Sequence, residues 1–117
     1  MHHESIEAMA DGNDGRSRAA TAIGAQAFAR LLRLAEERDS GQIARIARFL
    51  AATFNGEAHP FDVFELRAVD VAIGDDMLRC LDALRWGRAD LHKLVPDGDR
   101  RMCAVIVRWG LDRWARG

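Results

Sequence analysis

The stretch that decides the fold is residues 70–87, DVAIGDDMLRCLDALRWG. Its apolar residues recur with the three- and four-residue spacing of one helical face: Ile73, Met77, Cys80, Leu81 and Leu84. Asp70 suits the N-cap of such a helix, and Gly87 suits its end because glycine accepts a left-handed backbone conformation. Gly74 weakens the helix by roughly 1 kcal/mol relative to alanine, unless a neighbouring helix needs the close approach. We therefore predict an amphipathic α-helix here and expect it to be the central helix.

Two further helices are predicted before this stretch. The first covers about residues 21–38 and turns one apolar face inward, formed by Phe28, Leu31, Leu32 and Ala35. After a turn at residues 39–41, the second helix does the same with Ile43, Ile46, Ala47, Leu50 and Phe54. Asn55 and Gly56 predict a left-handed C-cap, and Pro60 marks a break. Asp62 and Glu65 have the spacing of a capping box, which predicts a short helix over residues 62–69.

The last helix is predicted after the turn residues Pro96, Asp97 and Gly98, with a short turn near residues 90–94 before them. Asp99 opens this helix. The side chains expected to face inward are Met102, Cys103, Ile106, Val107 and Trp114. Residues 105–107 are β-branched and also fit a short strand, although the helical spacing around them favours the helix.

Length and composition indicate one folded domain. The chain has 117 residues, of which 49% are hydrophobic and 30% are charged, as in ordinary globular proteins. Residues 1–20 lack a sustained helical or strand period, so we expect a flexible N-terminal tail. We predict an all-α fold, a compact bundle of four main helices with one or two short extra helices. The single helical domain covers residues 21–117, and the tail is disordered.

Charge, hydropathy and cysteine spacing exclude several classes of protein. The formal net charge of −1 gives no global attraction to nucleic acid or to an anionic membrane. The sequence has neither an apolar run of membrane-spanning length nor a secretion signal, so we expect a cytoplasmic protein without a membrane partner. Cys80 and Cys103 have no CxxC spacing, and we expect both to be reduced core residues.

A resemblance to a known family concerns roughly residues 28–84. The segments that carry it are RLLRLAEERDSGQ at residues 30–42, IARFL at residues 46–50, Asn55-Gly56, Phe61-Asp62, Leu66, Val69-Asp70, Ala72-Ile73 and Asp75-Asp76-Met77. In these segments the chain resembles a family of short uncharacterised bacterial proteins encoded on plasmids and integrated mobile elements. The resemblance implies a mobile-element accessory protein. That family is a domain of unknown function and provides no catalytic residue to carry over.

No catalytic, cofactor-binding or metal-binding residue is predicted. The densest acidic cluster consists of Asp62, Glu65, Asp70, Asp75 and Asp76. Paired carboxylates can hold Mg²⁺ or act as acid and base, but helix capping and a solvated helix face account for these residues. His59 and His92 stand alone near turns, where we expect surface residues, and the chain has no hydrolase or phosphate-loop motif. We predict that the protein is not an enzyme and has no cofactor.

The alternative function is a DNA-binding transcriptional regulator. The short turn between the first two predicted helices resembles that of a helix-turn-helix, with the second helix as the reading element. Its candidate nucleic-acid contacts are Gln42, Arg45 and Arg48. Glu36 and Glu37 lie beside them in the sequence and repel phosphates.

The leading hypothesis is a non-enzymatic protein-interaction module. Residues 57–82 contain seven acidic residues and two arginines, whereas residues 85–116 contain eight basic and four acidic residues. The two segments can pair with each other inside the domain, or they can form opposite faces that steer a protein partner or a second copy of the chain, as in a homodimer. Tryptophan and arginine are enriched at binding hot spots, but tryptophan is also a large core residue. Trp109 and Trp114 lie about 140° apart on a helix, so one can be buried while the other is exposed. The candidate partner surface therefore consists of Arg108, Trp109, Arg113, Trp114 and Arg116. The resemblance adds that the partner is a protein of host defence or element maintenance, which this chain inhibits or modulates.

Overall fold

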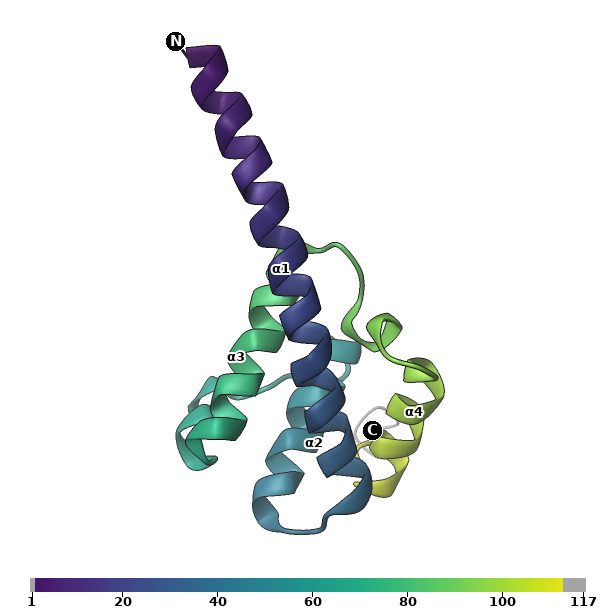
Figure 1. The fold of residues 1–117 in the computed structure, drawn as a ribbon. Coiled ribbons are helices and arrows are strands. Elements are labelled where there is room, and N and C mark those ends of the chain that lie inside the picture. Colours follow the sequence, from purple (N-terminus) through teal and green to yellow (C-terminus); the bar gives the residue numbers. More distant parts are fainter. Residues whose placement is uncertain (1, 113–117) are drawn as a thin grey trace.

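A long first helix is the axis of the molecule (Figure 1). The computed structural model describes residues 2–112, with side chains described from residue 12 onward. The elements in chain order are α1 (His2–Glu37), α2 (Gly41–Phe54), the 3₁₀ helix η1 (Val63–Ala68), α3 (Val71–Trp86), the 3₁₀ helix η2 (Leu91–Leu94) and α4 (Gly98–Arg108). Residues 2–112 contain no β-strand. The predicted all-α fold with four main helices and one or two short ones is confirmed.

The central helix is α1, and the prediction that residues 70–87 hold that place is wrong. α1 packs against α2, α3, α4 and η2, whereas α3 packs mainly against α1. The reason is side-chain size, because Phe28, Leu31 and Leu32 of α1 are fully buried and fill the space between the other helices. In Figure 1, α3 lies along one side of α1, α4 lies on the other, and the N-terminal half of α1 projects beyond them. The molecule is therefore elongated, with extents of 56 × 28 × 26 Å.

The first helix begins well before its predicted start near residue 21. Ser17 and Ala20 are buried in the structure. The Asp14 carboxylate accepts a hydrogen bond from the Arg88 guanidinium at 3.0 Å. These tertiary contacts support helical turns that sequence periodicity alone does not predict. The structure thus places residues 14–20 in packed helix, inside the segment expected to be a tail. The flexibility expected for residues 1–11 stays a prediction, since their side chains lie outside the described ones.

Small residues bring α1 and α3 close together. A Cβ atom at Gly24 would overlap that of Ala83 and would lie 3.0 Å from the carbonyl oxygen of Arg79. The Cys80 thiol donates to the Gly24 carbonyl oxygen at 3.9 Å, and burial raises the pKa of this thiol to about 12. At Gly74, where the sequence left a close helix approach open, the structure shows none, because a Cβ atom there would meet only ordinary contacts. The tight position is Gly24.

The helix ends follow the predictions in part. Gly87 ends α3 in the left-handed conformation with φ of 68°, as predicted. The left-handed cap predicted at Asn55 and Gly56 is wrong, since Asn55 has φ of −152° and Gly56 is not among the residues with positive φ. The Asn55 side chain instead accepts a hydrogen bond from the Ala58 amide at 3.2 Å. The chain therefore leaves α2 through a side-chain-stabilised turn.

The predicted capping box at residues 62–69 is also wrong. Asp62 does accept a hydrogen bond from the Phe64 amide at 2.9 Å. Glu65, however, does not reach back to Asp62, because its carboxylate binds Arg45 and Arg48 of α2. The segment forms the 3₁₀ helix η1 rather than an α-helix. Long-range ion pairing thus takes the place of the local cap.

Several predicted core positions of α3 and α4 are exposed. These are Leu81, Leu84, Cys103 and Val107. In α3 the face turned to α1 carries Asp76 and Ala83, whose small or paired side chains fit that contact. Val105 and Ile106 are the buried residues of the β-branched run. Because residues 105–107 lie within α4, the strand alternative is wrong. Trp114 lies outside the described residues.

Candidate protein-interaction surface

Apolar side chains are exposed together on the outer face of α3 and on η1. Phe64 is 67% exposed, Val71 is 80% exposed and Leu78 is 55% exposed, although each is a large apolar residue. The full set, which we name the α3–η1 surface, consists of Val63, Phe64, Val71, Leu78, Leu81 and Leu84. Single exposed apolar residues are common on soluble proteins, but a contiguous group is typical of a binding surface.

A groove runs between α2, η1 and α3 at one flank of this surface. It has a volume of about 220 Å³. Its walls are formed mostly by apolar side chains: Phe49, Ala52, Thr53, Phe61, Val63, Leu66, Leu81 and Leu84. Leu81 and Leu84 remain exposed because they border this groove rather than the α1 contact. The groove is large enough for one apolar side chain of a partner.

Charged side chains border the α3–η1 surface. The Arg85 guanidinium donates to the Asp82 carboxylate at 2.6 Å, one turn apart on α3. Arg67 lies over the Phe64 ring, 5.9 Å from its centroid. Asp75 is exposed and makes no ion pair with the described residues. An apolar centre with a charged rim is the usual composition of protein interfaces.

The residues predicted to contact nucleic acid are held by acidic partners. Arg45 donates to Glu65 at 3.2 Å, and Arg48 donates to the same carboxylate, which is largely buried. The Gln42 amide donates to Asp70 at 3.2 Å, and its oxygen accepts the Asp70 backbone amide. The structure therefore brings these three residues together on α2, but their polar atoms face η1 and the start of α3. A phosphate would have to compete with Glu65 for both arginines.

The predicted C-terminal surface is described only in part. Trp109 is half-buried, and its indole Nε1 donates to the Ala35 carbonyl oxygen at 2.9 Å. Arg108 donates to the Arg38 carbonyl oxygen at 2.9 Å and forms an ion pair with Asp39. Both side chains thus fasten the end of α4 to the end of α1. Arg113, Trp114 and Arg116 lie outside the described residues.

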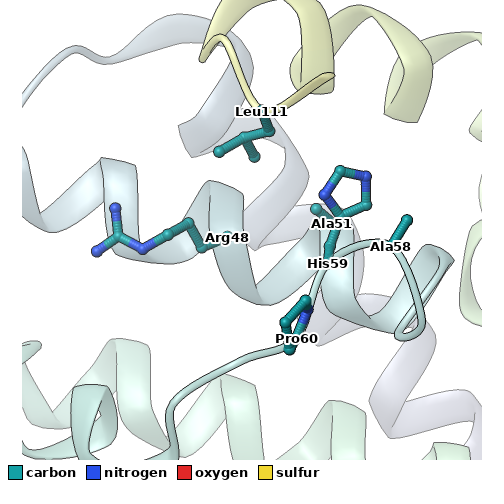
Figure 2. Close-up of a pocket in the computed structure, with 6 residues that line it drawn as sticks. All are labelled: Arg48, Ala51, Ala58, His59, Pro60 and Leu111. Carbon is teal, nitrogen blue, oxygen red and sulfur yellow. The ribbon is translucent and has the colours of Figure 1, made fainter. Parts of the chain in front are cut away.

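A second cavity lies between the end of α2 and the segment after α4 (Figure 2). It has a volume of about 480 Å³ and is lined by Arg48, Ala51, Ala58, His59, Pro60 and Leu111. Figure 2 shows the Arg48 guanidinium directed away from the His59 ring. The polar groups at this cavity therefore do not converge on one point, as they do in catalytic and ligand sites.

The acidic residues singled out in the sequence do not gather at one place. Asp76 is buried, and it accepts hydrogen bonds from Arg30 at 2.8 and 2.9 Å and from Arg79 at 2.8 Å, whereas Glu65 is held by Arg45 and Arg48. The hydrogen bond from Arg30 lowers the pKa of Asp76, and burial opposes this effect. In the part of the chain that the structure describes, no three His, Cys, Asp or Glu residues are grouped so as to hold a metal ion.

His92 is buried, so its expected surface location is wrong. Its ring meets the Phe54 ring edge to face, with centroids 4.8 Å apart. Its Nε2 lies 3.1 Å from an Asp99 carboxylate oxygen, while its Nδ1 has no partner among the described residues. The tight turn at Gly98 places this part of α4 directly against the His92 carbonyl group. This packing depends on η2 meeting α4, which no sequence motif signals.

The fold is that of a small all-helical domain, and among the described residues apolar side chains are exposed on α3 and η1. The chain belongs to the family of unknown function DUF7673, whose match covers residues 25–110. The match begins inside α1 and includes all the later helices. Searches of the curated proteins and of the solved structures find no match. Among residues 2–112, no helix combines the length and apolar character that crossing a membrane requires.

Proposed function

We propose that this protein is a non-enzymatic interaction module that binds another protein through the α3–η1 surface. The observation that carries the proposal is the set of six exposed large apolar side chains on α3 and η1, of which Val63, Leu81 and Leu84 border an apolar groove. Leaving such residues in water costs free energy that a partner recovers by covering them. The C-terminal residues predicted for this role are less suited to it, because Arg108 and Trp109 already serve to hold α4 against α1.

The finer part of the proposal concerns the setting. The resemblance over residues 28–84 supports a mobile-element protein that inhibits or modulates a host defence or element-maintenance protein. Membership of DUF7673 supports a shared domain and adds no activity. A cytoplasmic location fits the two free cysteines, of which Cys103 is exposed, since thiols persist in reducing compartments.

The test compares three forms of the tagged chain recovered from its native host, each with a nuclease-treated control. The forms are the natural chain, Leu78→Asp on the α3–η1 surface, and Val107→Asp on α4. Val107 is a matched control because it is also an exposed apolar helical residue, at 64%. Thermal unfolding of each purified form checks that neither change impairs folding.

We expect proteins that co-purify with the natural chain to persist with Val107→Asp and to be lost with Leu78→Asp. Loss with Val107→Asp alone would move the binding site to the C-terminal surface. Recovery of the same proteins from all three forms would refute the proposal for the α3–η1 surface. Enrichment of specific DNA without a protein would instead support the DNA-binding alternative, and Arg45 and Arg48 would be the residues to change.

A further inference from the structure

We propose that the cavity between the end of α2 and the segment after α4 (Figure 2) is a docking site for the chain's own Trp114. Trp114 lies outside the described residues. Three features of the described residues carry the inference: the course of the chain after α4, the short reach from there to Trp114, and the apolar walls of the cavity. The cavity is separate from the α3–η1 surface, so the inference does not depend on the proposed function.

The chain leaves α4 through a Schellman motif. Gly110 has the left-handed φ of 70°. Its amide donates to the Val107 carbonyl oxygen at 3.0 Å, and the Leu111 amide donates to the Ile106 carbonyl oxygen at 2.9 Å. These are the two hydrogen bonds that define the motif. Together they fix the direction in which the chain continues after the helix.

This turn brings the chain to the cavity. Leu111 packs against the hydrophobic core and also lines the cavity. Trp114 follows three residues later, and three residues span at most about 10 Å. An indole tethered so closely has a high effective concentration at the cavity, which favours it over a free ligand or a second copy of the chain.

The same turn changes the expected relation between the last two tryptophans. α4 ends at Arg108, and Gly110 interrupts the helical course. The separation of about 140° predicted for Trp109 and Trp114 on one helix is therefore wrong. Trp109 is already held by the hydrogen bond from its indole to the Ala35 carbonyl oxygen. Trp114 is thus the tryptophan that remains for the cavity.

The cavity suits an indole in size and in chemistry. Its volume is about 480 Å³, and a cavity of about 150 Å³ already holds benzene. Ala51, Ala58 and Pro60 form apolar walls. His59 adds an aromatic ring, which can meet an indole edge to face, and Arg48 adds a cation, for which tryptophan is the best aromatic partner. Because its polar groups do not converge on one point, the cavity favours an apolar occupant over a charged ligand.

The test is fluorine NMR of the full chain labelled with fluorotryptophan, in the presence of a soluble paramagnetic chelate. The chelate broadens the resonances of exposed rings, and Trp114→Phe identifies the Trp114 resonance by its loss. We expect this resonance to broaden severalfold less in the folded chain than in urea. Equal broadening in both would overturn the proposal. Protection that disappears on dilution would also overturn it, because the indole would then lie in a contact between copies.

Filling the cavity tests where the indole is protected. Ala58→Phe places a ring in the cavity from its wall and should expose Trp114 to the chelate. Ala104→Phe is the matched control, because Ala104 is an exposed alanine on α4. Protection of Trp114 that survives Ala58→Phe, or that Ala104→Phe removes equally, would overturn docking in this cavity.

Thermal unfolding gives an independent readout. Trp114→Ala should lower the Tm of the natural chain by about 4 °C or more, because a docked ring buries apolar surface. In the Ala58→Phe chain the same change should shift the Tm by less than about 1 °C, since the ring is already displaced. Arg116→Ala is the control and should leave the Tm nearly unchanged in both chains. Equal shifts on Trp114→Ala in the two chains would contradict the proposal.

Discussion

The contact between Gly24 of α1 and Ala83 of α3 predicts that Gly24→Ala destabilises the protein. Two effects oppose each other at this position. Alanine is better than glycine inside a helix by about 1 kcal/mol. The added methyl group, however, would overlap the Ala83 Cβ and press on the Arg79 carbonyl oxygen at 3.0 Å. Overpacking of a fitted contact costs about 1–3 kcal/mol and more where backbone must move. We expect a net loss of about 1–2 kcal/mol.

Gly15→Ala is the matched control for this prediction. Gly15 also lies in α1, and a Cβ atom there would meet nothing within 4 Å. Only the propensity effect remains, so this change should stabilise the protein by up to about 1 kcal/mol. Urea unfolding followed by circular dichroism measures both changes. In a chain of 117 residues, 1 kcal/mol corresponds to a shift of about 4 °C in Tm.

A compensating change tests the cause. Ala83→Gly removes the overlap and loses about 1 kcal/mol of helix propensity in α3. Combined with Gly24→Ala, it exchanges the two residues across the contact, and the pair should recover most of the stability lost by Gly24→Ala alone. If Gly24→Ala stabilises the protein as much as Gly15→Ala does, the close approach of α1 and α3 is refuted.

Three further predictions concern single groups. Arginine partners lower the pKa values of Asp76 and Glu36 below 3.8 and 4.5. The stability they contribute is therefore present above those values and is lost as the pH falls through the lower folded-state pKa values, as acid unfolding should show. A thiol reagent should modify the exposed Cys103 at once but Cys80 only on unfolding, because Cys80 is buried and its pKa is raised to about 12. Trp109→Phe keeps an aromatic ring but loses the 2.9 Å hydrogen bond to α1, which should cost about 1 kcal/mol in urea unfolding. Equal reaction of the two cysteines in the folded protein would contradict the burial of Cys80. An unchanged unfolding midpoint for Trp109→Phe would contradict a stabilising role of the indole hydrogen bond.

Local signals in the sequence predict much of this fold. Gly87 ends α3 in the left-handed conformation as predicted, although the same signal at Asn55 and Gly56 does not give such a cap. Phe28, Leu31 and Leu32 are buried as predicted. Large apolar side chains on one helical face are buried whichever element packs against that face.

Features that depend on a distant partner are not predictable in the same way. Periodicity shows that Leu81 and Leu84 belong to an apolar side of α3, but it does not show whether another helix covers that side. Glu65 has the right spacing for a local cap, yet two arginines of α2 hold it. The sequence therefore placed the candidate surface at the end of α4, whereas the structure places it on α3 and η1. Only the packed structure shows which apolar residues remain exposed.

The continuity of α1 has a mechanical consequence. At 1.5 Å per residue, the helix from Asp14 back to His2 extends about 18 Å beyond the contact of Asp14 with Arg88. A tilt of about 5° at that contact displaces the tip by about 1.6 Å. This projecting part of α1 amplifies small changes in the spacing between α1 and α3. A spectroscopic label near the N-terminal end of α1 would therefore report a change in the α1–α3 spacing that binding on the opposite side of α3 causes.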